Sequence, residues 1–168
     1  MDELPYSQAC ENNKKPIASE LARLLAQTGT VLEIGAGTGQ HAVFFAASMP
    51  WLQWRPTELA ANLPILRPRC DAYAGSNLRA PMALDVCARP WPSACRGDAL
   101  FTANTFHIMA WSAVESLFAA LAEHGDSFGK LAVYGPFNYD GRYTSASNAE
   151  FDQWLSQRDP RSAIRDFE

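Results

Sequence analysis

The chain has 168 residues, of which 48% are hydrophobic and 19% are charged, and its formal net charge is −4. This length and composition predict one globular domain with its own hydrophobic core. The acidic balance, without any basic stripe, argues against general binding of nucleic acids or anionic membranes. No apolar run approaches the roughly 18 residues of a membrane span, and the N-terminus lacks signal-peptide features, so we expect a cytoplasmic protein.

The first half of the chain alternates helix and strand patterns. Apolar residues at helical spacing predict a helix over 16–27, and a strand follows at 31–34. A glycine-rich turn leads into a helix over 38–48, and a strand at 52–55 should end at Pro56. Glu58 opens a short or kinked helix that contains Pro64 and Pro68, and a third strand is predicted at 82–84.

The second half continues the alternation with strands at 98–103 and 130–134. Ser112 and Glu115 form a capping box before an amphipathic helix. Ser147 and Glu150 repeat this pattern before a last helix that runs to about residue 158. Strands that alternate with helices predict an α/β fold, a Rossmann-like parallel sheet with helices on both faces, in a single domain over 1–168.

Residues 30–39, Thr-Val-Leu-Glu-Ile-Gly-Ala-Gly-Thr-Gly, predict a cofactor-binding turn between a strand and a helix. Glycine at 35, 37 and 39 tolerates positive φ and lets a ligand approach the backbone. A dinucleotide fingerprint would have its third glycine at 40, where the chain has Gln40. Glu33 would repel a pyrophosphate but attract the ammonium and sulfonium groups of S-adenosylmethionine. An ordinary turn is the alternative.

Polar side chains also end the next two predicted strands, at the edge where parallel α/β folds bind ligands. Glu58 stands about 20 residues after Gly35, the offset at which a carboxylate accepts hydrogen bonds from ribose hydroxyls. A helix N-cap is the alternative for Glu58. Asp85 could accept a hydrogen bond from an adenine amino group, or it could be a turn aspartate that binds its own backbone.

The segment Asn104-Thr-Phe-His-Ile follows the fourth strand, where a methyl donor and an acceptor would meet. Methyl transfer mainly requires alignment of the nucleophile and shielding of the site. His107 is the candidate general base, and support of the cofactor loop is the alternative. The segment departs from the Asn-Pro-Pro-aromatic signature of amino-group methyltransferases, so a nucleobase nitrogen is not supported as the acceptor.

Aromatic and amide side chains near the fifth strand predict an organic substrate pocket. Tyr134 and Asn138 are the candidates there, and Trp111 and Tyr6 could join them, although aromatic residues also pack in cores. The polar segment 10–16 could cover the cofactor as a lid, with Asn13 as its contact, and a helix-entry loop is the alternative. Scattered cysteines and histidines predict no metal site; they are Cys10, Cys70, Cys87, Cys95, His41, His107 and His124.

Motifs along almost the whole chain resemble the methyltransferase-like protein 26 family, which has the class I S-adenosylmethionine-dependent methyltransferase fold. They are Ala9-Cys-Glu-Asn-Asn13, Leu32-Glu-Ile-Gly-Ala-Gly-Thr-Gly-Gln-His41, Asn104-Thr-Phe-His-Ile108, Tyr134-Gly-Pro-Phe137 and Ile164-Arg-Asp166. The resemblance implies a three-layer αβα sandwich with sheet order 3-2-1-4-5. It implies cofactor contacts at Glu33, Gly35, Gly37, Glu58, Asp85 and Asn104, to which we add Ala36, Gly39, Leu59, Val86, Thr105 and Asn13.

Two departures from the family pattern affect these expectations. Segment 123–129 replaces a compact glycine turn on the face away from the site. The chain also stops at Glu168, where the family continues into a helix and a terminal strand pair. We therefore expect a C-terminally truncated domain whose fifth strand is an exposed edge, open to self-association, and which could bind cofactor without activity.

The leading hypothesis is therefore an S-adenosylmethionine-dependent methyltransferase that acts on an unidentified small-molecule or macromolecular acceptor. A non-catalytic module that binds the cofactor or a partner is the second hypothesis. A nicotinamide-dependent oxidoreductase is the third, and Gln40 argues against it.

Overall fold

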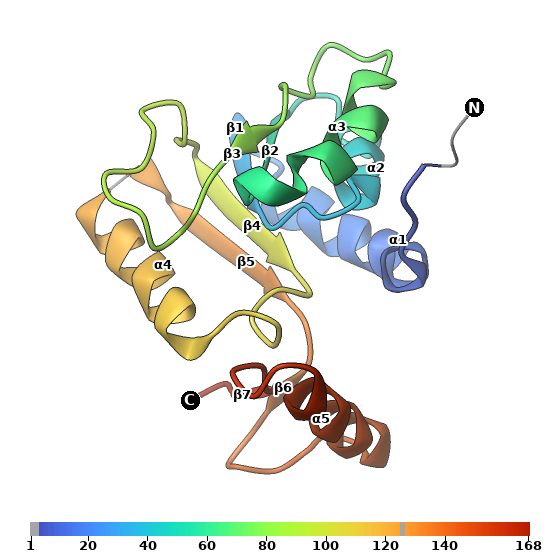
Figure 1. The fold of residues 1–168 in the computed structure, drawn as a ribbon. Coiled ribbons are helices and arrows are strands. Elements are labelled where there is room, and N and C mark those ends of the chain that lie inside the picture. The colour runs from blue at the N-terminus through green and yellow to red at the C-terminus, as the bar shows by residue number, and fades with distance from the viewer. Residues whose placement is uncertain (1–3, 125–126) are drawn as a thin grey trace.

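A computed structural model describes residues 4–124 and 127–168 of the chain. Its centre is a five-stranded sheet in which all neighbouring strands are parallel and the order is β3-β2-β1-β4-β5 (Figure 1). The strands are β1 Thr30–Ile34, β2 Gln53–Glu58, β3 Met82–Ala83, β4 Ala99–Ala103 and β5 Lys130–Tyr134. This topology confirms the predicted α/β fold and its strand order 3-2-1-4-5.

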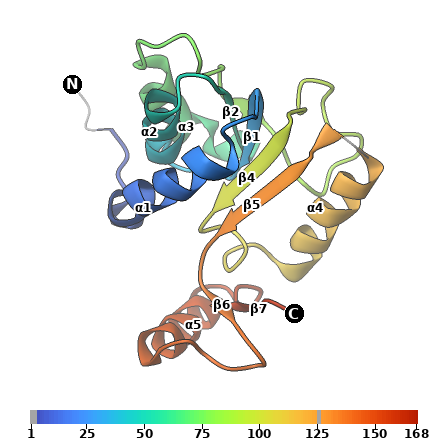
Figure 2. The same ribbon diagram turned by 180° about the vertical axis from the view of Figure 1, so that it is seen from behind.

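Helices cover both faces of this sheet, as Figures 1 and 2 show. On one face lie α1 (Gln8–Leu24), α2 (Gln40–Ser48) and α3 (Leu63–Asp71), which follows the 3₁₀ turn Ala60–Asn62. Helix α4 (Trp111–Glu123) covers the other face. A small C-terminal unit lies beyond the carboxyl ends of β4 and β5; it consists of β6 (Phe137–Asn138), α5 (Ala146–Arg158) and β7 (Arg165–Asp166).

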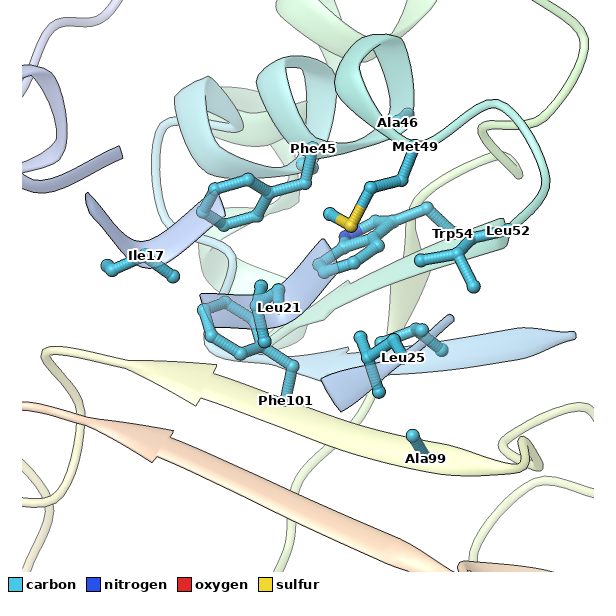
Figure 3. Packing of buried hydrophobic residues seen from close by; sticks show 12 residues of the cluster. Ile17, Leu21, Leu25, Phe45, Ala46, Met49, Leu52, Trp54, Ala99 and Phe101 are labelled. Atoms are coloured by element: carbon cyan, nitrogen blue, oxygen red, sulfur yellow. The ribbon is translucent and has the colours of Figure 1, made fainter. Parts of the chain in front are cut away.

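The core under α1 and α2 is built around three aromatic rings (Figure 3). The ring of Phe45 lies edge-on to Phe101, with centroids 5.4 Å apart, and Trp54 is 5.6 Å from Phe101. All three side chains are at most 1% exposed. On the other face, Leu32 and Leu100 pack with Leu117 of α4 in a second core. The alternation of these side chains along β1 and β4 therefore gives the sheet two buried faces.

Helix α1 begins eight residues earlier than the predicted helix over 16–27, at Gln8, and ends at Leu24. Ser7 starts it, since its hydroxyl accepts a hydrogen bond from the Cys10 N–H. Pro16 therefore lies inside the helix, where its missing N–H leaves the Asn12 carbonyl without the usual helical partner. The alternative of a helix-entry loop over 10–16 is wrong, because these residues form the first turns of α1, and a cover over the cofactor stays a prediction.

Pro56 lies inside β2, although the sequence predicts that it ends the strand. The backbone of Trp54 bonds toward the β3 side, where its N–H donates to the Asn77 carbonyl over 2.8 Å. Backbone groups two residues apart in a strand point to the same side, so the nitrogen of Pro56 also faces β3. On that side β3 pairs only with the last two residues of β2. The missing N–H of Pro56 therefore leaves the ladder between β2 and β1 intact.

Both predicted capping boxes are wrong in position. Ala110 precedes α4 and makes no side-chain cap, so Ser112 lies inside the helix. Ser145 rather than Ser147 caps α5, because its hydroxyl accepts the Asn148 N–H over 3.1 Å. Among the described residues, β5 pairs only with β4, as expected of an edge strand, and association through this edge stays a prediction. No helix in 4–124 or 127–168 has the length and apolar composition to cross a bilayer.

We expect Phe45→Ala to lower the free energy of unfolding by about 3–5 kcal/mol, because it removes a fully buried ring from the centre of the first core. Phe167→Ala is the matched control, because this ring is 67% exposed and its loss should cost about 1 kcal/mol or less. Urea denaturation followed by circular dichroism measures both. Equal costs for the two variants would contradict the packing described here.

Candidate functional site

The turn between β1 and α2 contains three glycines in the left-handed region, with φ of +68° at Gly35, +55° at Gly37 and +77° at Gly39. A Cβ on Gly35 would lie 2.5 Å from the Cγ2 of Thr105. Thr105 is itself positioned by Thr102, whose hydroxyl lies 2.5 Å from the Thr105 hydroxyl and donates to the Ile34 carbonyl. Glycine at 35 is therefore required by contact between the turn and the end of β4.

Gly37 stands at the open side of the turn. A Cβ added there would meet no described atom within 4 Å. The Gly37 N–H donates to a carboxylate oxygen of Glu58 over 2.9 Å, and the other oxygen of Glu58 accepts bonds from the Leu59 N–H and the Asn62 side chain. The free space above Gly37 thus lies beside a carboxylate that still has acceptor capacity.

Gly39 serves packing between helices. It is the residue before α2, and a Cβ there would lie 3.0 Å from Leu66 and 3.4 Å from the Cys70 sulfur, both on α3. We predicted a cofactor contact at Gly39; its geometry is accounted for by the close approach of α3, and the contact stays a prediction.

The residue after the last glycine, Gln40, holds the start of α1 against the turn. Its side chain is 5% exposed, donates to Glu11 over 2.7 Å and accepts the Ser7 N–H over 2.5 Å. Arg69 of α3 supports the same segment by donating to the Thr38 and Pro5 carbonyls. From the sequence, Gln40 is notable only because it departs from a dinucleotide fingerprint. No pattern in the sequence predicts its contacts with Ser7 and Glu11.

Glu33 lies under the turn and is 2% exposed. Its carboxyl group accepts the indole N–H of Trp54 over 2.7 Å. Burial raises the pKa of Glu33 to about 7; the hydrogen bond from Trp54 opposes this shift and the negative charge of Glu58 adds to it. Glu33 is therefore poised between its neutral and charged forms near neutral pH.

Asn13 and His41 join α1 to α2 beside the turn. The Asn13 Oδ1 lies 2.7 Å from the His41 Nε2, and both residues are buried. Burial lowers the pKa of His41 to about 4, so its ring is neutral at physiological pH. The ring also stacks on Phe45 with centroids 5.1 Å apart, which connects this pair to the first core. His41 escapes sequence reasoning because it belongs to no metal or catalytic spacing.

Asp85 and Val86 follow β3 and stand near Glu58, because the Leu84 N–H donates to the Glu58 carbonyl over 2.9 Å. The exposed Asp85 carboxylate accepts the Cys87 N–H over 2.9 Å, which is the turn geometry weighed as its alternative role. Its second oxygen has no partner among the described residues, so the adenine contact stays a prediction.

An open cavity of about 610 Å³ lies between α1, the ends of β4 and β5, and α5. Three predicted residues meet in its wall: Asn13 from α1, Asn104 after β4, and Tyr134 at the end of β5. Asn104 adopts a left-handed φ of +57°, and its N–H donates to the Tyr134 carbonyl, which ties the two strand ends together. The described residues that line it are Ala9, Asn12, Asn13, Pro16, Asn104, Tyr134, Gly135, Pro136, Phe137, Tyr139, Thr144, Asn148 and Phe151.

The four other residues that we predict for catalysis or substrate binding lie outside this lining. His107 is 5% exposed, and its ring contacts the wall residue Phe151 edge-on at 5.4 Å. Burial, followed by the charge of Arg165, lowers the pKa of His107 to about 4, which makes it a weak base. Asn138 is 9% exposed, and its Oδ1 is buried without a partner within the described residues. Trp111 and Tyr6 are half or more exposed, and their substrate contacts stay predictions.

Comparison with known proteins gives a family and a fold. A family model described as "Protein of unknown function (DUF938)" matches residues 4–168. An O-methyltransferase family protein from Burkholderia thailandensis has a similar structure, with a TM-score of 0.74 and 14% identity over 95% of this chain and 48% of its own. Human N-acetylserotonin methyltransferase in complex with SAM has a TM-score of 0.71 and 13% identity over 95% of this chain and 44% of its own.

The methyltransferase CalO1 of calicheamicin biosynthesis, in its SAH-bound form, gives a TM-score of 0.64 and 17% identity over 91% of this chain and 45% of its own. The chain thus spans about half the length of the structures that it matches. These similarities establish a methyltransferase-like fold.

We expect Glu33→Gln to change how stability depends on pH. The pKa of Glu33 in the fold is about 7 against an ordinary 4.5, so the stability that its proton contributes is present below pH 4.5 and is lost as the pH rises through 7. The loss is on the order of 3 kcal/mol. Urea titrations at pH 5 and pH 8 should show that the stability of the Glu33→Gln variant, relative to the wild type, is higher at pH 8 than at pH 5. The same stability difference at both pH values would contradict the raised pKa of Glu33.

We expect Gly35→Ala and Thr105→Ser to be strongly coupled. The alanine methyl would meet the Thr105 methyl at 2.5 Å and would sit at positive φ, which together should cost about 2–4 kcal/mol. Serine at 105 removes that methyl and keeps the hydroxyl. The double variant should therefore be less destabilised than the sum of the single variants by about 1 kcal/mol or more, as measured in a double-mutant cycle. Additive costs would show that this contact does not demand glycine.

Proposed function

We propose that this chain, which belongs to the DUF938 family, binds S-adenosylmethionine at the glycine turn and transfers its methyl group to a small organic acceptor in the adjoining cavity. The observation that carries the proposal is the juxtaposition of the two sites. Asn13 and Asn104 both line the cavity, and both are joined to the turn region: Asn13 pairs with His41 at the start of α2, and Asn104 precedes Thr105, which contacts Gly35.

The residues around the turn fit this cofactor. The space above Gly37 would admit a ligand against the backbone, and the Glu58 carboxylate retains an acceptor position suited to a ribose hydroxyl. Asp85 and Val86 would border the adenine ring, with a free carboxylate oxygen for its amino group. Glu33 beneath the turn would be favoured in its charged form by a nearby cation. Neighbours of the same fold that are described with SAM or SAH bound support this assignment.

When bound, S-adenosylmethionine would supply an electrophilic methyl group to a heteroatom of the acceptor and would leave as S-adenosylhomocysteine, and any proton on that heteroatom would pass to bulk solvent. This chain's own contribution is to orient the acceptor and shield the site. Asn13 and Asn104 would align the acceptor from the turn side, and Tyr134 and Phe151 would exclude water from the far side. His107 would support Phe151 from behind, since its lowered pKa makes it a poor base.

The finer family assignment is also a proposal. Asn104-Thr-Phe-His-Ile108 and Tyr134-Gly-Pro-Phe137 resemble the methyltransferase-like protein 26 family, and both segments contribute residues to the cavity wall. A non-catalytic binding module is the second candidate, favoured by the lack of a charged base among the described lining residues. Release of S-adenosylhomocysteine during incubation with a metabolite extract would separate an enzyme from such a module.

Calorimetric titration with S-adenosylmethionine and S-adenosylhomocysteine tests the proposal directly, and we expect Gly37→Ala to abolish binding of both. Its methyl would project into the space that the ligand needs. Gly141→Ala is the matched control, because Gly141 has a similar φ of +66° and equally open surroundings. Both variants should lose about 1 kcal/mol of stability from backbone strain, and only the first should lose affinity. Wild-type protein that binds neither compound would reject the proposal.

A further inference from the structure

We propose that the cavity takes an uncharged, flat organic molecule with hydrogen-bonding groups at its edge, in preference to a carboxylate, a phosphate or an ammonium compound. This inference rests on the proposed function, because it identifies the acceptor class of the same site. Three features of the wall carry it: its neutrality, its amide groups and its aromatic faces.

The wall of the cavity is electrically neutral. Within the described residues its lining includes no Asp, Glu, Lys, Arg or His. Two charged groups on the neighbouring helices already have partners: Lys14 binds Glu11 over 2.5 Å, and Asp152 accepts the Ile164 N–H and the Tyr143 hydroxyl. An ionised acceptor would therefore lose hydration in the cavity without gaining a counter-charge, which costs free energy.

Amide groups on opposite walls offer one donor and one acceptor to a neutral ligand. His41 occupies the Oδ1 of Asn13, so the Asn13 amide nitrogen is left as a donor on the α1 side. Asn148 donates its amide nitrogen to the Thr144 hydroxyl over 2.8 Å, which leaves its oxygen as an acceptor on the α5 side. A neutral molecule that carries both an acceptor and a donor, such as an aromatic alcohol, matches this arrangement.

The aromatic residues provide flat walls of fixed orientation. Phe151 is held edge-on by His107 and stacks on Trp154 at 5.8 Å with 14° between the planes. Phe137 is held edge-on by Phe106 and Phe167. The exposed rings of Tyr134 and Tyr139 complete this side of the cavity. A volume of about 610 Å³ falls within the range of small-molecule sites, and flat aromatic surfaces favour planar ligands.

Calorimetry with three probes that share the naphthalene ring and differ in the charge of one substituent tests the inference. We would titrate 2-naphthol, 2-naphthoate and 2-naphthylmethylammonium at about pH 7.5 into protein with and without saturating S-adenosylhomocysteine. The neutral probe should bind at least about tenfold more tightly than either ion. A charged probe that binds as tightly as 2-naphthol overturns the inference, and so does a failure of all three to bind. Binding of S-adenosylhomocysteine is read separately, so the proposed function stands or falls independently.

A charge placed in the wall should reverse the preference. Asn148→Asp adds a carboxylate at the start of α5, where the helix dipole tolerates it, and should make the ammonium probe the tightest of the three. Gln153→Glu is the matched control, because it adds the same charge to an exposed position of the same helix outside the lining and should leave the order of affinities unchanged. An unchanged order in Asn148→Asp would place the probes elsewhere and overturn the inference.

Discussion

The hydrogen bond from the Gly37 N–H to the Glu58 carboxylate fixes the geometry on which the candidate site depends. It ties the turn after β1 to the end of β2, while the contact between Gly35 and Thr105 ties the same turn to the end of β4. Three neighbouring strands thereby hold a short stretch of backbone in the left-handed region, where a free chain would rarely stay. The site is thus organised before any ligand arrives, which lowers the cost of binding.

The strands of the central sheet could be predicted from the sequence because local apolar patterns and the tertiary structure agree there. Apolar runs at 31–34, 98–103 and 130–134 are buried or paired in the sheet and are followed by turn or helix signals, and the structure places strands at all three. The helices were predicted less well. Pro16 is typical of a helix start, but Ser7 provides an earlier cap, and Pro56 is tolerated because its missing N–H would face β3 and not β1. Both exceptions depend on neighbours that lie far away in the sequence.

The sequence allowed us to predict which residues lie at the candidate site, but it did not reveal the side-chain contacts that hold them in place. Strand ends identify Glu33, Glu58, Asn104 and Tyr134, because parallel strands bring their carboxyl ends to one edge. Gln40 and His41 are missed because their partners, Glu11 and Asn13, lie some 30 residues away on α1. The wall supplied by α5 is missed for a similar reason, since the two-residue strands β6 and β7 that anchor it are too short to give a pattern.

The contacts of Gln40 and Arg69 show that the residues just before α1 belong to the folded domain. Removal of residues 5–7 would take the Ser7 N–H from the buried Gln40 side chain and the Pro5 carbonyl from the half-buried Arg69, and unpaired polar groups there are costly. Shortened versions of this chain should therefore keep residues 5–7. An affinity tag at the N-terminus should be placed before these residues and separated from them by a flexible spacer.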